Sequence, residues 1–223
     1  MRRPEVSEAS IKLHGGRTAS IDRHRRAVVA ATLVGGTAVL GTTLAAAPGS
    51  TLFYGLGFLA ASIWIAGGLL SGSIPWTRNG LKEVRLVHIV VPIMAGAALF
   101  GAFFAAKLVA ARIPVLHHSV ESVLARADAG PRLLVLVVAL VNGIGEEVLF
   151  RGALYDAFDN HPAVWATAIY CIVTVATLNV SLVVAAVIMG TVFGLERRAS
   201  GDVLAPLLTH LSWSTLVLLF LPR

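Results

Sequence analysis

The chain has 223 residues, of which 57% are apolar and only 13% are charged, and its formal net charge is +6. Soluble domains usually carry about 25% charged residues, so this composition excludes an ordinary soluble enzyme. The single cysteine, Cys171, excludes a disulfide scaffold and any site that needs two thiols. At roughly 20 apolar residues per crossing, the length predicts an all-α, polytopic membrane protein with about seven transmembrane helices.

The N-terminal segment is strongly basic, because residues 1–26 hold seven of the 18 lysine and arginine residues. We expect a disordered cytoplasmic tail over 1–26, in contact with anionic lipid, followed by a transmembrane domain over 27–223. The other basic residues mostly flank apolar runs, where positive charge sets membrane orientation. No basic stripe with interleaved aromatic residues occurs, so nucleic acid is not an expected partner.

Apolar runs predict membrane helices at 27–47, 51–71, 87–109, 132–153, 162–179, 180–196 and 203–221. Between the third and the fourth run, segment 110–131 has apolar residues at helical spacing, and we expect an amphipathic helix along the membrane interface. With a cytoplasmic N-terminus, successive crossings place this segment and the C-terminus outside. The chain is therefore expected to be a multi-pass protein of the plasma membrane.

The run at 132–153 carries charges that an apolar helix cannot easily accommodate, and such charges mark function by default. Glu147 and Arg151 are four residues apart with the acid first, which predicts a buried ion pair on one helix face. Glu146 points about 100° away from them and needs a partner, a proton or a water. The nearby Gly143 and Gly145 permit a close helix approach or a local break.

A second polar set lies in the final run, where His210 and Ser214 share one helix face. Counting from the cytoplasmic side places His210 near the depth of Glu146, about 10 Å into the membrane. Equal depth predicts a shared site, in which Glu146 and His210 face each other across a polar cavity that opens to the cytoplasm.

These residues resemble a known family. Glu146-Glu147-Val-Leu-Phe-Arg151 is similar to the EExxxR motif of the CPBP intramembrane proteases, the CAAX-processing and bacteriocin-processing group also called Abi. The stretch from Gly194 to His210 resembles the run into the last motif of that family, HxxxN or HxxxD. The resemblance covers about 130–221. It implies that Glu146 activates water, that Glu147 and Arg151 support it, and that His210 polarises the substrate or binds a metal.

The sequence departs from the family pattern at two places. Ser214 stands where the last motif has Asn or Asp, and the fifth helix has no His for the FxxxH motif. Spacing from Trp165 puts Asn179 at the missing position, and Thr174 is the other candidate because it lies nearer the depth of Glu146. We assign Asn179 to the catalytic set, with a cap of the turn between the fifth and sixth helices as its alternative interpretation.

Catalytic zinc normally has three protein ligands and an open position. Here only Glu146 and His210 are clear candidate ligands, so zinc has poor support and no cofactor is assigned. A scheme without metal uses Glu146 as the base that deprotonates a water, and Asn179 or His210 as the donor to the developing oxyanion.

The expected function is an intramembrane endopeptidase that hydrolyses a peptide bond in a membrane-associated protein or peptide near the cytoplasmic face. The alternative is a catalytically inactive scaffold or partner-binding protein built on the same fold. A third hypothesis, an ion or solute carrier with Glu146 as a proton relay, is weakened by the absence of internal repeats. The expected partners are the lipid bilayer and a membrane-associated substrate.

Overall fold

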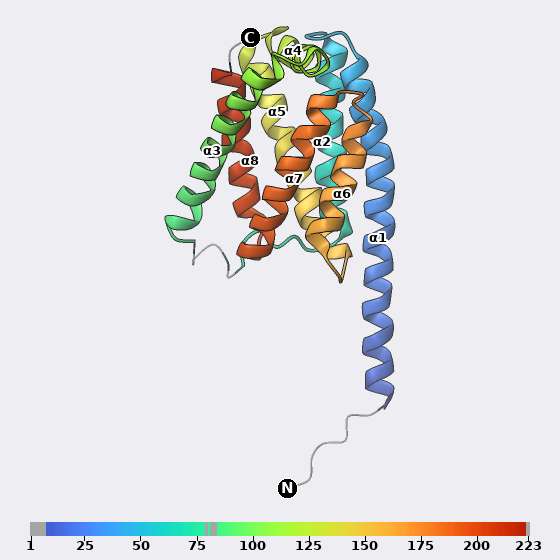
Figure 1. The fold of residues 1–223 in the computed structure, drawn as a ribbon. Coiled ribbons are helices and arrows are strands. Elements are labelled where there is room, and N and C mark those ends of the chain that lie inside the picture. The colour runs from blue at the N-terminus through green and yellow to red at the C-terminus, as the bar shows by residue number, and fades with distance from the viewer. Residues whose placement is uncertain (1–7, 79, 81–83, 222–223) are drawn as a thin grey trace.

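The computed structural model describes residues 8–78, 80 and 84–221, with side chains from residue 23 onward, and its described part is helical without strands (Figure 1). The longer helices are α1 (Glu8–Ala45), α2 (Thr51–Ser71), α3 (Val87–Ala110), α5 (Arg132–Glu147) and α7 (Val180–Ser200). The shorter helical elements are α4 (Pro114–Asp128), η2 (Val148–Leu154), η3 (Tyr155–Ala157), α6 (Pro162–Val175) and α8 (Leu204–Phe220).

Among the described residues, five helical stretches are long and apolar enough to cross a membrane: Arg23–Ala45, α2, α3, α7 and the continuous stretch Arg132–Ala157 that joins α5 to η2 and η3. This confirms a polytopic helical membrane protein. The apolar helices α6 and α8 are shorter, at 14 and 17 residues. The count of seven crossings therefore stays a prediction.

Helix α1 begins at Glu8 and includes most of the basic segment 1–26, for which a disordered tail was predicted, while residues 1–7 lie outside the described part. No proline interrupts the chain between Pro4 and Pro48, which allows one helix to continue through the basic segment. Ion pairs also hold the basic segment against the bundle, because Arg25 contacts Asp156 at 3.3 Å. Contacts with distant residues favour the helix here, and composition alone did not reveal them.

Helix α4 lies across the end of the bundle where α8 ends, opposite the N-terminal end of α1 (Figure 1). Pro114 opens this helix at a position where a proline costs no hydrogen bond. Its buried residues, Ser119 and Leu124, face the bundle. The predicted helix within 110–131 is confirmed, while its position outside the cell stays a prediction.

The stretch Arg132–Ala157 runs through the bundle, with α2 and α8 packed against α5. Gly145 permits the close approach of α2, since a Cβ atom there would lie 3.0 Å from the carbonyl oxygen of Ala61. Directly after Glu147 the backbone becomes π-helical over Val148–Leu154, and all seven residues are buried. Short π-helical segments inside α-helices occur frequently at functional sites.

Candidate active site

The buried centre of the bundle is an ion-pair network around Glu147. The Oε1 atom of Glu147 accepts a hydrogen bond from Arg151 at 3.2 Å and another from the Nδ1 atom of His210 at 2.9 Å. All three side chains are buried, and Glu147 is 0% exposed. The pair expected from the i, i+4 spacing is present, and α8 adds a third member that helix periodicity could not identify.

Aromatic rings and a backbone carbonyl complete the surroundings of Arg151. Its guanidinium carbon lies 5.0 Å from the ring centroid of Tyr170 and 5.2 Å from that of Phe193. One guanidinium nitrogen also lies 3.4 Å from the carbonyl oxygen of Gly190. Cation–π contacts of this kind are stronger where water is excluded. Arg151 therefore links η2 to α6 and α7 as well as to Glu147.

Glu146 has a separate partner on α6. Its Oε2 atom accepts a hydrogen bond from the hydroxyl of Tyr170 at 2.8 Å. In the described part of the chain its Oε1 atom makes no hydrogen bond, and the side chain lines a cavity. Sequence reasoning missed Tyr170. The available signal was a tyrosine inside an apolar run, because a buried tyrosine hydroxyl usually requires a polar partner.

A cavity of about 430 Å³ brings the predicted residues together. Its lining includes Glu146, Tyr170, Thr174, His210 and Ser214. The depth match between Glu146 and His210 therefore corresponds to a shared cavity, although the wall of this cavity is mostly apolar and not polar as predicted.

The direction of this cavity bears on two predictions, the cytoplasmic N-terminus and the opening of the cavity to the cytoplasm. From Glu146 it extends along α5 past Val135 to Ser122 and Arg126 of α4, at the end of the bundle opposite the N-terminal end of α1. A cytoplasmic N-terminus and a cavity open to the cytoplasm are therefore incompatible. Most of the cavity wall is apolar, because the faces that α1, α5 and α8 turn inward there carry few polar side chains.

One ring nitrogen of His210 is available to accept or donate a proton in the cavity. Because Nδ1 donates to the carboxylate of Glu147, the second nitrogen, Nε2, can accept or donate a proton elsewhere. Nε2 lies at the cavity next to Gly143, where an added Cβ atom would stand 3.5 Å away. The absence of a side chain at Gly143 therefore keeps the space beside this nitrogen open.

Asn179 lines the same cavity, but its side chain caps α7. Its Oδ1 atom accepts from the backbone nitrogen of Leu182 at 3.0 Å and from the hydroxyls of Ser119 and Ser181. Its Nδ2 atom donates to the carbonyl oxygen of Ser119 and to the hydroxyl of Ser122. The structure thus shows the cap that was the alternative interpretation. These bonds occupy both polar atoms of Asn179, and its amide is not available to an oxyanion.

Thr174, the other candidate for the missing histidine position, also lines this cavity. It is one turn beyond Tyr170 on α6, and its hydroxyl donates to the carbonyl oxygen of Tyr170 at 2.8 Å. A hydroxyl bonded within its own helix is a poor substitute for a histidine ligand.

The donors that face the cavity do not fit a catalytic zinc. Glu146 and the Nε2 atom of His210 are two ligands, whereas catalytic zinc usually takes three from the protein. Within the described residues, no three His, Cys, Asp or Glu side chains are grouped so that they could hold a metal ion. Asn179, at the position of the missing histidine, is bound to α4 and α7 instead.

Comparison with protein families supports the motif assignment. Residues 128–216 match the family model described as type II CAAX prenyl endopeptidase Rce1-like. The matched segment includes Glu146, Glu147, Arg151, Tyr170 and His210. Neither a curated protein nor a solved structure matches the chain.

Proposed function

We propose that this protein is an intramembrane endopeptidase that uses Glu146 to activate water and hydrolyses a peptide bond in a membrane-associated protein or peptide. The observation that carries the proposal is the shared cavity of Glu146, Tyr170 and His210 inside the segment that matches the endopeptidase family. The same match makes a carrier or an inactive scaffold the weaker explanation.

The partners of the two adjacent carboxylates support different roles for them. Glu147 is bound to Arg151 and His210 and has no exposure, so it serves as a structural anion. Glu146 reaches the cavity with one oxygen held by Tyr170. In the proposed step, its other oxygen takes a proton from a water molecule, and the water oxygen bonds to the substrate carbonyl carbon. The same proton then passes to the leaving amine as the carbon–nitrogen bond breaks.

His210 is the proposed donor to the oxyanion. The Glu147 carboxylate at Nδ1 stabilises the protonated imidazole, much as a buried carboxylate does in a serine protease triad. The Nε2–H group can then hydrogen-bond the negative oxygen that forms in the cavity. This role replaces the amide of Asn179 in the reaction, and Asn179 is a positioning residue for the turn before α7.

The cavity favours a substrate that reaches the site from the membrane. Its wall is mostly apolar, and it extends to α4 at one end of the bundle, where a membrane-tethered peptide can enter. A prenylated C-terminus, which the name of the matched family indicates for its members, is one substrate of this kind. The proposal requires only an extended peptide with an apolar tether.

The test is cleavage of a membrane-tethered peptide library, including prenylated C-termini, by the purified protein in lipid nanodiscs. Glu146→Gln keeps the size and removes the base, and we expect the rate to fall by roughly 10²–10⁴-fold. Glu121→Gln on α4 is the matched control, because this glutamate pairs with Lys107 outside the cavity lining. A wild-type protein that is folded and cleaves no substrate in the library would favour the scaffold instead.

A further inference from the structure

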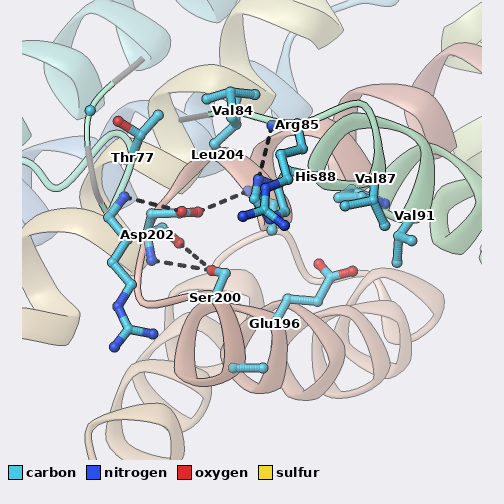
Figure 2. Close-up of a pocket in the computed structure, with 15 residues that line it drawn as sticks. Thr77, Val84, Arg85, Val87, His88, Val91, Glu196, Ser200, Asp202 and Leu204 are labelled. Atoms are coloured by element: carbon cyan, nitrogen blue, oxygen red, sulfur yellow. Dashed lines mark hydrogen bonds between the residues drawn. The ribbon is translucent and has the colours of Figure 1, made fainter. Parts of the chain in front are cut away.

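A second cavity, of about 620 Å³, lies at the end of the bundle opposite α4, and we call it the α3–α7 pocket (Figure 2). It lies between the stretch before α3, the start of α3, the end of α7 and the start of α8. The residues that line it and those that line the candidate active site do not overlap. The proposed peptidase reaction therefore gives no role to this pocket.

One side of the pocket is cationic. Arg85 lines this side, and its guanidinium has no hydrogen bond or ion pair within the described part of the chain, while Arg78 also lines the pocket with its side chain against Gly201. The Nδ1 atom of His88 accepts a hydrogen bond from the backbone nitrogen of Arg85 at 3.2 Å. The Nε2 atom of the neutral ring therefore carries the proton and is a donor. The guanidinium group of Arg85 and this N–H group form a suitable environment for a phosphate.

The α7 side of the pocket carries a carboxyl group. Glu196 points from α7 into the space where Arg85 and His88 also lie (Figure 2). Its Oε1 atom accepts from the hydroxyl of Thr209 at 2.7 Å, and its Oε2 atom has no partner among the described residues. The adjacent cation, Arg197, is engaged elsewhere, because it binds Asp156 at 2.9 Å. Glu196 can therefore accept a hydrogen bond from an ammonium group.

The other carboxylate in the pocket is already satisfied. The Oδ2 atom of Asp202 accepts from the backbone nitrogen of Arg78, and its Oδ1 atom accepts from the backbone nitrogen of Ala205 at the start of α8. Asp202 thus shapes the pocket, and Glu196 is the carboxylate whose Oε2 atom has no partner among the described residues.

The pocket opens toward the lipid-facing side of α3. Val87 and Val91 of its wall are 52% and 59% exposed, and they belong to a helix that is long and apolar enough to span a membrane. Its position at the helix ends corresponds to the headgroup layer of a bilayer. A ligand with a polar head in the pocket and an apolar tail along α3 would match both surfaces.

We propose that the α3–α7 pocket binds the phosphoethanolamine headgroup of a phospholipid, with the phosphate at Arg85 and His88 and the primary ammonium at Glu196. A purely anionic headgroup would leave Glu196 unpaired. A choline headgroup has no N–H group to donate to the carboxylate. The lipid source is favoured over a free aminoalkyl phosphate because the pocket opens along the apolar surface of α3.

The experiment measures binding of short-chain phosphatidylethanolamine, phosphatidylcholine and phosphatidylglycerol to the full chain in detergent, by native mass spectrometry. We expect phosphatidylethanolamine to bind roughly tenfold more tightly than either of the others, as one additional charge-assisted hydrogen bond permits. Glu196→Gln should remove this preference. Arg85→Gln should weaken all three phospholipids by about tenfold, because each has the phosphate. Arg112→Gln, at the other end of α3, is the matched control and should change nothing.

Several outcomes would overturn the proposal. General attraction to positive charge would give tightest binding of phosphatidylglycerol. Equal binding of the three lipids, a preference that survives in Glu196→Gln, or unchanged affinities in Arg85→Gln would show that these groups do not hold the headgroup. Soluble phosphoethanolamine that binds as tightly as the lipid would assign the site to a free aminoalkyl phosphate. None of these outcomes depends on peptidase activity, so the test stands apart from the function proposed above.

Discussion

Adjacent residues of a helix point about 100° apart, and this turn gives Glu146 and Glu147 different surroundings. Glu147 meets Arg151 and His210 inside the bundle, while Glu146 meets Tyr170 at the cavity. A buried charge is tolerated only when it is paired and hydrogen-bonded. The pairing of Glu147 therefore stabilises the fold. The Oε1 atom of Glu146, which has no hydrogen bond in the described part of the chain, is available for catalysis.

Replacing Arg151 by alanine should destabilise the protein by about 3–5 kcal/mol, because it leaves the carboxylate of Glu147 buried beside His210 alone. Apolar replacement of both Glu147 and Arg151 should be milder, although it leaves the Nδ1 atom of His210 without its acceptor. The measurement is the free energy of unfolding in detergent, with Arg112→Ala as the exposed control. Equal stability of all these variants would show that Glu147 and Arg151 are not a buried pair.

Part of this site was predictable from the sequence. The spacing of Glu147 and Arg151 fixes their contact within one helix, and depth counting correctly placed Glu146 and His210 at one cavity. The bond between His210 and Glu147 depends on how α8 rotates against α5, and periodicity does not report that rotation. The partner of Glu146 was missed for the same reason, because Tyr170 belongs to another helix.

The turn between α6 and α7 shows that the unpaired backbone N–H groups at the start of a helix can determine the role of a residue. The first backbone N–H groups of a helix lack partners within it, and an asparagine before the helix can supply one. Asn179 does so for α7, and it also joins α7 to Ser119 and Ser122 of α4. The predicted fifth helix ends at Val175, four residues earlier than expected, which places Asn179 at this cap.

Asn179→Ala should therefore reduce stability by about 1 kcal/mol or more, as expected for a lost N-cap, while the turnover of the folded protein stays close to wild type. Asn179→Ser keeps an acceptor for the helix end and should recover part of that stability. Melting temperature and turnover per folded molecule separate the two roles. A large loss of turnover at unchanged melting temperature would return Asn179 to the catalytic set.

Among the elements, the apolar helices were predicted well because length and hydropathy are properties of single segments. The sequence carried less information where an element depends on its neighbours. Helix α1 continues through the basic segment that Arg25 ties to Asp156, and the π-helical backbone of Val148–Leu154 had no sequence signal in our reading.

At the scale of the whole molecule, the orientation in the membrane is linked to the direction of the active-site cavity. Positive residues around α1 and before α3 predict that the end of the bundle opposite α4 faces the cytoplasm. The cavity extends to α4, so substrates would then enter from the side of the membrane opposite the cytoplasm. The orientation of the protein in the membrane therefore determines the side from which substrates enter the cavity.

Thiol labelling in intact cells tests the orientation. In a Cys171→Ala background, a cysteine at Val115 of α4, which is 67% exposed, should react with a membrane-impermeant maleimide from outside. A cysteine at Trp76, which is 43% exposed at the opposite end, should react only after permeabilisation. The reverse pattern would place α4 and the cavity on the cytoplasmic side.

The central claim is that the two adjacent glutamates divide structure and chemistry between them. The most direct measurement compares melting temperature and cleavage rate for Glu146→Gln and Glu147→Gln in the same lipid nanodiscs. We predict that Glu146→Gln melts near the wild-type temperature and loses at least about 10²-fold in rate, because only the base is removed. Glu147→Gln should melt at a clearly lower temperature, because Arg151 and His210 lose their shared anion. A Glu146→Gln protein that cleaves at the wild-type rate, beside a Glu147→Gln protein that is inactive at unchanged melting temperature, would contradict this assignment.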